Sequence, residues 1–387
     1  MMRLAIVTPR FGPDVGGGAE TLARGFALEA ARRGWQVSAW TTCARSHYTW
    51  ANEHPAGQAD DNGVRVWRFP VVKLDEAEQA GREIRLATQG VLPRPEQYRW
   101  VEGGPHSPEL YAHIKANAAA TDAILVMPYA TPMMHAAAWC APEKVILVPC
   151  LHNEPYAYLE PVHLLAESVR GVLFNAPEEG ELMIRTLRMR PRHQAVLGVG
   201  IPIPYPLPTP HVADPPYLFL ISRLEAGKNV PLVYEYMEKY WQNRGRVRLI
   251  VAGSGPLTPP DHPAFSFRGF VSEEEKSQLC AGALAVLQPS LNESFGITLL
   301  DSWLAGRPVL VHGDGAVTRG QVRRARGGLW FGDEDEFAAA IHWLHTHPEQ
   351  ASQMGQNGRA YTLQNYTWPA LLDRFTHIWH RWENSEQ

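Results

Sequence analysis

The sequence predicts an α/β protein built from two doubly wound parallel-sheet domains. Short apolar runs alternate with amphipathic helical patterns along both halves of the 387 residues, and this alternation favours parallel sheets with helices on both faces. Seven prolines fall between positions 201 and 216, and such a stretch forms a stiff linker rather than a helix or a central strand. Glycine-rich or polar loops follow several of the expected strands, at the edge where such sheets bind ligands.

The first half has the elements of one such domain. Short β-rich runs bounded by glycine, proline or polar residues predict strands at residues 4–8, 37–41, 64–68, 123–127, 145–148, 171–174 and 195–197. Apolar residues at helical spacing predict helices at residues 19–34, 108–119 and 178–187, and Gly34 ends the first of them. The pattern is irregular over residues 71–104, which carry more arginines and aromatic residues than a connection normally needs.

The second half repeats the alternation. Strands are expected at residues 217–221, 249–252, 283–287 and 309–311, and helices at 229–241, 272–280, 334–345, 348–364 and 368–382. A further helical pattern begins just after Gly296 and ends at Gly306, and Pro308 then leads into the next strand. Residues 283–311 therefore have the pattern of one β-α-β unit.

Composition excludes several classes of function. The chain is 45% hydrophobic and 20% charged, as in an ordinary globular enzyme, and its net charge of -4 argues against a nucleic-acid partner. Its four cysteines have neither metal-site spacing nor a paired framework, so they are expected to be reduced. The chain starts with a strand rather than a signal peptide, and no apolar run approaches the roughly 20 residues of a membrane span. A cytoplasmic location is expected, with any membrane contact peripheral and at the inner face.

The loop and helix after the strand at residues 283–287 hold the densest set of candidate ligand-binding groups. Glu293 lies in the loop and Asp301 lies eight residues on, about two turns into the helix. Two carboxylates at this spacing can frame one ligand. The amide groups of Phe295, Gly296 and Ile297 would point from the helix start toward an anion. The alternative is that both carboxylates only cap or solvate the helix.

Other strand ends carry further candidates. Arg223 and Lys228 follow the strand at residues 217–221, and arginine can make a forked contact with phosphate oxygens while lysine supplies a compact second charge. His152 follows the strand at residues 145–148, although a single loop histidine is more often structural. Two glycine-rich turns would let a ligand approach the backbone. Their candidate residues are Gly17, Gly18 and Glu20 after the first strand, and Gly253, Ser254 and Gly255 after the strand at residues 249–252.

These motifs, in this order, resemble those of the retaining glycosyltransferases of sequence family four, or glycosyltransferase group 1. The matching segments are a Gly-Gly-Ala-Glu loop at Gly17, the segment of His152, an Arg-x4-Lys motif at Arg223, a Gly-Ser-Gly-Pro turn at Gly253, and a Glu-x7-Glu motif at Glu293. In the last motif Asp301 replaces the second glutamate. The resemblance spans nearly the whole chain and implies a glycosyltransferase B-type fold, in which two Rossmann-like domains face each other across a cleft.

The resemblance also implies a division of labour. Residues 1–203 would form the acceptor-side domain and residues 204–365 the nucleotide-sugar donor domain, with the C-terminal helix, residues 366–387, packing back on the first. The implied contacts of single residues are as follows: His152 beside the transferred sugar, Glu293 on its hydroxyls, Arg223 and Lys228 on the donor diphosphate, the amides of Phe295, Gly296 and Ile297 on sugar and phosphate, and Asp301 on the nucleotide ribose.

The expected function is retaining transfer of a sugar, expected to be a hexose, from a nucleotide-diphosphate sugar to a hydroxyl of a carbohydrate or glycolipid. Such a transfer belongs to glycan, glycolipid or cell-surface polysaccharide synthesis. Arginines and aromatic residues of the segment 71–104 are candidates for acceptor recognition, and the alternative is that this segment is a surface elaboration without a binding role. No cofactor and no metal are expected, because two basic residues supply a metal's electrostatic role and the acidic pairs at 60–61 and 333–335 are expected in connections away from strand ends. A nucleotide-sugar hydrolase or epimerase, or a non-catalytic sugar-nucleotide binding protein, are the alternatives.

Overall fold

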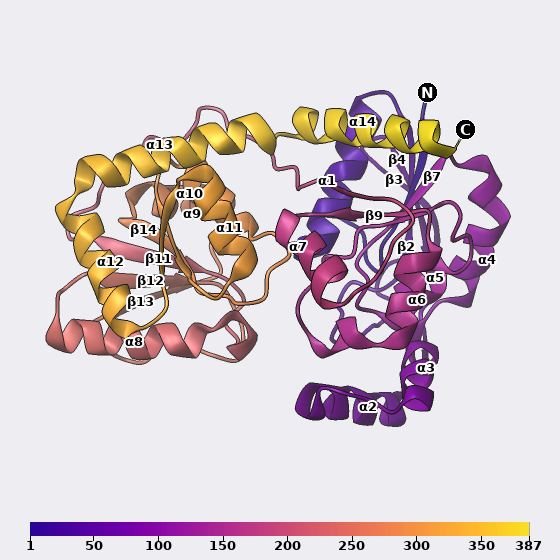
Figure 1. Cartoon of the computed structure of the whole chain (residues 1–387), viewed down its shortest axis with the longest axis horizontal. Helices are drawn as coiled ribbons and strands as arrows, with labels where there is room; N and C mark the ends of the chain where they lie inside the picture. Colours follow the sequence, from indigo (N-terminus) through magenta and orange to yellow (C-terminus); the bar gives the residue numbers. More distant parts are fainter. Residues whose placement is uncertain (387) are drawn as a thin grey trace. The chain divides into compact units, whose positions relative to one another are not determined.

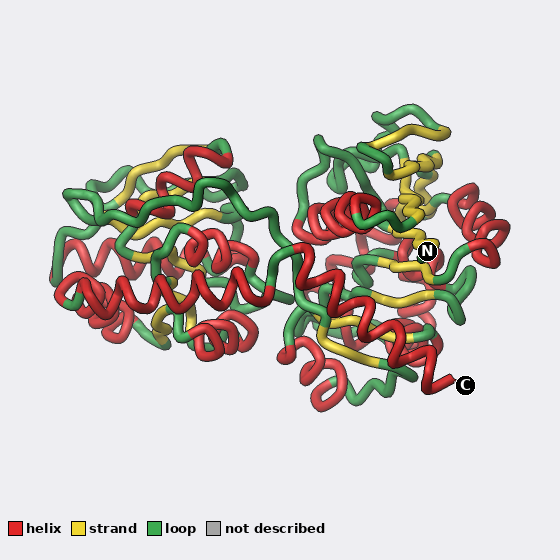
Figure 2. Tube along the Cα trace, turned by 90° about the horizontal axis from the view of Figure 1, so that it is seen from above, coloured by secondary structure: helices red, strands yellow, loops and turns green. Residues whose placement is uncertain are grey.

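The structure, a computed structural model that describes residues 1–386, divides into two units by its internal contacts (Figure 1). The first unit contains residues 1–200 and the C-terminal segment that begins at Trp368. The second unit is Ile201–Thr367. Strands in each unit are flanked by helices (Figure 2). The predicted α/β class with two parallel-sheet domains is confirmed.

The first unit is built on an eight-stranded sheet of order β10-β9-β8-β7-β1-β2-β4-β3. Its strands are β1 (Arg3–Val7), β2 (Gln36–Thr42), β3 (Gly57–Asp61), β4 (Val64–Phe69), β7 (Ala123–Val126), β8 (Val145–Leu147), β9 (Gly171–Phe174) and β10 (Gln194–Val196). All neighbours pair in parallel except β3 and β4, which are antiparallel. The central strands β1 and β7 consist of buried apolar residues after Arg3, because helices cover both faces of such sheets.

Helices surround this sheet. They are α1 (Gly18–Arg32), α4 (Pro108–Asn117), α5 (Pro132–Ala138), α6 (Glu160–Ser168), α7 (Pro177–Glu181) and α14 (Trp368–Glu386), with short helical turns η1 (Ala118–Ala120), η2 (Pro155–Tyr158) and η3 (Leu182–Thr186). The amphipathic α14 packs on α1 through Phe375, whose ring meets Phe26 edge-on at 5.3 Å (Figure 1). Gly25 of α1 allows this approach, since a Cβ there would lie 2.2 Å from the ring of Trp368.

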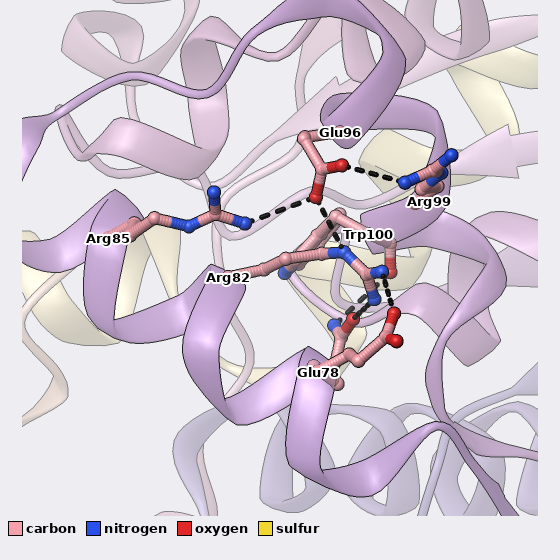
Figure 3. A network of polar contacts seen from close by, with 7 residues as sticks. Glu78, Arg82, Arg85, Glu96, Arg99 and Trp100 are labelled. Atoms are coloured by element: carbon pink, nitrogen blue, oxygen red, sulfur yellow. Dashed lines mark hydrogen bonds and ion pairs between the residues drawn. The ribbon is translucent and has the colours of Figure 1, made fainter.

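The segment 71–104, whose sequence pattern is irregular, folds into regular elements. It contains α2 (Glu76–Gln89) and α3 (Arg94–Glu102) between two short strands, β5 (Val72–Leu74) and β6 (Gly104–His106), which pair with each other. Arg82 is 3% exposed and lies 2.8 Å from Glu78 and 3.0 Å from Glu96. Glu96 also binds two further arginines, Arg85 and Arg99 (Figure 3).

The arginines proposed for acceptor recognition are therefore paired within the unit. Arg94, the fourth of them, binds both carboxylate oxygens of Glu160, at 2.6 and 2.8 Å. A cluster of cations and aromatic rings in a sequence does not reveal such pairing, because the carboxylates come from another helix turn or another element. The contacts of Arg82 and Arg85 with Glu96 hold α2 and α3 together.

The second unit has a six-stranded, all-parallel sheet of order β13-β12-β11-β14-β15-β16. Its strands are β11 (Tyr217–Ile221), β12 (Arg248–Ala252), β13 (Phe265–Gly269), β14 (Ala285–Gln288), β15 (Val309–His312) and β16 (Gly328–Phe331). Its helices are η4 (Ala226–Lys228), α8 (Val230–Asn243), α9 (Glu273–Gly282), α10 (Ile297–Leu304), α11 (Ala316–Ala325), α12 (Glu334–Thr346) and α13 (Pro348–Asn365). The edge strands β13 and β16 are additions to the predicted set.

The acidic pairs lie elsewhere than expected. Asp60 and Asp61 belong to strand β3 rather than to a connection, and Asp61 binds Arg24 at 2.7 Å. Asp333 lies two residues after the end of β16 and caps α12 by accepting a hydrogen bond from the Glu336 amide at 2.9 Å. The expectation that both acidic runs lie away from strand ends was wrong, because Asp60 and Asp61 end an edge strand with little apolar pattern and Asp333 lies two residues after β16. No helix among residues 1–386 is long and apolar enough to cross a membrane.

Candidate active site

The topology of the second unit brings its candidate residues to one place. Strands β11 and β14 are neighbours, and the chain continues from β11 to β12 and β13 on one side but from β14 to β15 and β16 on the other. Ligands bind at the carboxyl ends of strands at such a switch point. The loops that follow β11, β12 and β14 carry the predicted cations, the glycine turn and Glu293.

One ion pair joins the loops after β11 and β14. Lys228, the last residue of η4, places its Nζ 2.7 Å from Oε1 of Glu293. The two side chains are 17% and 15% exposed, so the pair is largely withdrawn from solvent yet not sealed. Asn229 adds a second link, because its side-chain amide donates to the Pro289 carbonyl at 3.2 Å. The structure thus brings together two residues that lie 65 positions apart in the sequence.

Arg223 lies in the same loop but is differently placed. Its Nη2 lies 3.2 Å from Glu225, and 58% of its side chain is exposed. An exposed ion pair of this kind contributes little energy. The guanidinium can therefore leave Glu225 for a stronger anionic partner.

The glycine turn after β12 holds this loop in place. A Cβ on Gly253 would lie 1.9 Å from the carbonyl oxygen of Ser222, and one on Gly255 would lie 2.4 Å from that of Leu224. The amide of Leu224 donates to the Ser254 carbonyl at 2.9 Å. The two glycines are therefore required for close packing against the residues on either side of Arg223.

The start of α10 offers backbone donors. Gly296 precedes the helix with φ 84°, a left-handed conformation that glycine adopts without strain, and no side chain caps the helix there. The first amides of α10 can therefore donate to a ligand, as at other helix N-termini, although the Leu299 amide already donates to the Gly296 carbonyl at 3.0 Å. Phe295 contributes only its backbone, since its side chain is 3% exposed and packs edge-on against Tyr366 at 4.9 Å.

Asp301 already has a partner within the unit. Its carboxylate lies 3.3 Å from Nζ of Lys276, which also lies 2.7 Å from Glu273. Burial raises the pKa of the Asp301 carboxyl, while the charge of Lys276 opposes that shift. The sequence offered no sign of this contact, because Lys276 belongs to a separate helix, α9.

In the first unit the glycine loop rests on a buried ion pair. Gly17 and Gly18 are exposed at the start of α1, and Gly17 has φ 142°. Glu20 is 8% exposed and binds Arg10 at 2.5 Å. A Cβ on Gly17 would lie 2.2 Å from the Glu20 carboxylate, so this carboxylate lies directly under the loop. From this position the Glu20 carboxylate supports the glycine loop, and it is already bound to Arg10.

His152 lies in the loop after β8 and is 29% exposed. Its Nδ1 is 3.8 Å from Oε1 of Glu154, which is too long for a hydrogen bond. The same oxygen of Glu154 accepts a hydrogen bond from the Tyr129 hydroxyl at 2.8 Å. The ring of His152 is therefore accessible, with an anchored carboxylate beside it.

Sequence reasoning missed Glu179, which holds the His152 loop. Its side chain is 1% exposed, and its two oxygens accept hydrogen bonds from the backbone amides of Leu151 and Asn175, each at 2.5 Å. Burial raises the pKa of Glu179 to about 8. A signal existed, because Glu179 lies four and eight positions before the buried Met183 and Leu187 and so falls on the apolar side of the helical pattern.

Comparison with known proteins finds a family that resembles the second unit. Residues 208–361 match the family described as glycosyl transferases group 1. The D-rhamnosyltransferase WbpZ of Pseudomonas aeruginosa is 30% identical over 131 residues, which cover 31% of this chain and 34% of WbpZ. The chain thus aligns with about a third of the length of this curated relative.

Solved structures match over almost the whole chain. Sucrose-phosphate synthase from Thermosynechococcus elongatus superposes with a TM-score of 0.74 at 16% identity and covers 100% of both chains. Anabaena HepE in complex with UDP-glucose has a TM-score of 0.66 at 16% identity and covers 99% of this chain and 100% of its own. Residues 208–361, which lie in the second unit, are thus similar to the group 1 glycosyltransferases, and the chain has the GT-B fold of these solved structures.

Proposed function

We propose that the protein is a retaining glycosyltransferase that moves a sugar from a nucleotide-diphosphate sugar to a hydroxyl of a carbohydrate or glycolipid acceptor. The observation that carries this proposal is the Lys228–Glu293 pair at the switch point of the second unit. Lys228, a cation suited to a phosphate, there contacts Glu293, a carboxylate suited to sugar hydroxyls. The UDP-glucose bound by HepE, a protein of the same fold, supports a donor of this class.

The leaving diphosphate is the group that needs most stabilisation. Arg223 can turn from its exposed contact with Glu225 to the phosphates, and Lys228 lies within one short loop of it. The uncapped amides at the start of α10 would stabilise the negative charge that develops on the leaving diphosphate. Fixed donors of this kind stabilise a transition state because they need no reorganisation as the bond breaks.

Glu293 is proposed to orient the transferred sugar. One of its oxygens is bound by Lys228, and the other is left to accept a sugar hydroxyl. Lys228 holds the Glu293 carboxylate in one position, which favours a single sugar orientation. Attack on the face that the diphosphate leaves, with a donor phosphate oxygen taking the acceptor proton, needs no protein nucleophile. His152, from the first unit, is proposed to contact the transferred sugar.

No divalent cation is part of the proposal. Arg223, Lys228 and the α10 amides supply the positive potential that a metal would supply to a diphosphate. Asp301, with Lys276 beside it, is proposed to bind the ribose hydroxyls of the donor.

The test has two parts. The melting temperature of the protein is measured with UDP-glucose, GDP-mannose and ADP-glucose, because a ligand that binds only the folded state raises it. Release of nucleoside diphosphate from the stabilising donor is then measured with and without a set of sugar acceptors. Release that depends on an acceptor supports transfer. Full release without acceptor would make the protein a hydrolase, and no stabilisation by any nucleotide sugar would overturn the proposed site.

A further inference from the structure

A groove lies at the amino ends of strands β1, β2 and β4 in the first unit. It is on the opposite edge of this sheet from His152 and the glycine loop, which follow the carboxyl ends of their strands. Its volume is about 550 Å³, which is within the range of small-molecule sites. The side chains that matter here are Trp35, Ser38, Asp60, Arg65, Trp67 and Asn117.

The floor of the groove departs from the usual sheet of such a domain. Parallel strands covered on both faces are rich in Val, Ile and Leu. Here Ser38 on β2 lies beside Arg65 on β4, and Asp60 on β3 lies opposite Arg65. Three side chains of one sheet face are thus polar, side by side on adjacent strands. This face is suited to a polar ligand rather than to an additional helix.

Helix α4 stops short of these residues. Its His113 packs on the same face further along the strands, with ring centroids 5.0 Å from those of Trp40, Trp67 and Phe69. Asn117, one turn later, lines the groove and donates to the His113 carbonyl at 2.8 Å. The end of α4 therefore forms a wall of the groove, and Trp67 lies between the covered and the open part of the face.

Charges in the groove are balanced. Arg65 and Asp60 have opposite charges on directly opposed residues, and Arg3, at the edge of the groove, binds Asp122 at 2.7 Å. Arg65 is exposed and has no ion pair among residues 1–386, so its guanidinium is available to a ligand. Such a groove has no net positive potential that would select a phosphate or a nucleic acid.

Trp35 and Trp67 add half-buried indole rings. An indole combines a broad apolar face with one N–H donor. A pyranose has the complementary surface, because its axial C–H bonds form an apolar face and its hydroxyls lie around the rim. Carboxylate, guanidinium and amide groups such as Asp60, Arg65 and Asn117 can each bind two neighbouring hydroxyls.

We propose that this groove is a binding site for a neutral oligosaccharide, separate from the site of sugar transfer. Trp35 and Trp67 pack against sugar faces, and Asp60, Arg65 and Asn117 bind the hydroxyls. Trp35 also lines a second concavity, of about 620 Å³, beside α14, so a chain of several sugars has room to continue past it. A site of this kind holds a glycan on the protein without taking part in the reaction.

Calorimetric titration of the full chain, without donor, tests this proposal. The probes are maltohexaose, α-mannohexaose, cellohexaose and xylohexaose. At least one of them is expected to bind saturably to the parent protein. Arg65→Ala and Asp60→Asn are each expected to weaken that binding roughly tenfold or more, the change that follows from loss of one hydrogen bond to a charged group.

Arg248→Ala is the matched control. Arg248 is likewise an exposed arginine on a strand, but it begins β12 in the second unit, outside the groove. It should bind the probe as the parent does. Asp60 accepts a hydrogen bond from the Gly63 amide at 3.1 Å, and Asp60→Asn keeps an oxygen that can accept it. This variant therefore tests whether the glycan binds in the groove if Arg65→Ala does not fold.

Two results would overturn the proposal. One is that none of the four hexasaccharides binds saturably. The other is that a hexasaccharide binds but both groove variants bind it as tightly as the parent, because the glycan would then lie elsewhere. Neither result depends on donor turnover, so the proposed transferase function stands or fails separately.

Discussion

Glu293 has one carboxylate for two roles, as the partner of Lys228 and as the proposed acceptor of a sugar hydroxyl. Replacing it by glutamine keeps the shape but removes the charge that holds Lys228 at 2.7 Å. Glu293→Gln is expected to keep the fold and nucleotide binding and to lower turnover roughly tenfold or more, since about 1.4 kcal/mol of lost transition-state stabilisation is tenfold in rate. Steady-state turnover of the donor identified by thermal shift checks this.

A matched control for that variant is Glu235→Gln. Glu235 also lies 2.7 Å from a lysine, Lys239, but is 58% exposed and far from the strand ends on helix α8. Its loss should leave turnover unchanged. If Glu293→Gln behaves in the same way, Glu293 does not belong to the active site.

Asp301 is one methylene shorter than the glutamate of the family's motif and is bound to Lys276. A hydrogen bond to a charged group is worth roughly 1.5 to 3 kcal/mol, or about one to two powers of ten in affinity. Asp301→Ala should raise the KM for donor by that factor with little change in kcat, because ribose contacts are alike in ground and transition states. An unchanged KM with a lower melting temperature would instead limit Asp301 to its contact with Lys276.

Glu179 predicts a pH dependence of stability. Its pKa is about 8 in the folded protein, whereas an unfolded glutamate has a pKa of about 4.3. Between these values the folded state holds a proton that the unfolded state has lost, so its contribution to the free energy of unfolding falls as pH rises through this window. Glu179→Gln cannot titrate and should lose less stability than the parent between pH 5 and pH 8, by chemical denaturation at each pH.

A loss of stability in Glu179→Gln that equals or exceeds that of the parent would contradict the raised pKa of Glu179. If the variant and the parent lose stability equally over this interval, Glu179 is ionised at both pH values, and its two backbone hydrogen bonds outweigh its burial. At pH 5 the variant should be less stable than the parent. The backbone N–H groups of Leu151 and Asn175 each donate to a carboxyl oxygen of Glu179, and in the glutamine variant one of these N–H groups would face the NH₂ donor of the side chain.

At the scale of the element, the turn between β12 and the following chain determines where Arg223 lies. Gly253→Ala adds a Cβ 1.9 Å from the Ser222 carbonyl at φ 123°, so the loop must move. We expect a loss of about 1 to 3 kcal/mol in the free energy of unfolding, from overpacking and strain, and a higher KM for donor. Denaturant unfolding and donor kinetics on the same variant measure both.

Gly227 supplies the comparison within the same loop. A Cβ there meets nothing closer than the Glu225 carboxylate at 3.9 Å, and its φ is ordinary. Gly227→Ala should therefore fold as stably as the parent or slightly more so, because alanine reduces the freedom of the unfolded chain. Equal losses in both variants would mean that any alanine in these loops is harmful, and that close packing at Gly253 has no special role.

At the scale of the whole molecule, the proposed chemistry requires no bound metal. Two basic side chains and the start of α10 are proposed to bind the diphosphate in place of a metal ion. Transfer activity is expected to survive EDTA, as measured by nucleoside diphosphate release with and without the chelator. Loss of activity that Mg²⁺ or Mn²⁺ restores would contradict the role assigned to Arg223 and Lys228.

Much of the fold follows from local patterns in the sequence. Apolar periodicity and the glycines and prolines between runs predict the central strands and their helices, because buried strands and amphipathic helices depend on near neighbours. Edge strands are harder to predict in this way: β3 is Gly-Gln-Ala-Asp-Asp and largely exposed, β13 has no buried residue, and β16 is only half buried. Their structure comes from pairing with a neighbour strand, which no local pattern records.

The sequence by itself determined the order of the central strands and the helices between them, the two-unit organisation and the loops that carry Arg223, Lys228 and Glu293, since those loops follow from strand ends. Only the tertiary structure decided their partners. Lys228 meets Glu293, Lys276 meets Asp301, and Glu179 reaches Leu151 across 25 to 65 positions of chain. A side chain's partner depends on which strands lie side by side, and strand order is a property of the whole sheet rather than of any segment in it.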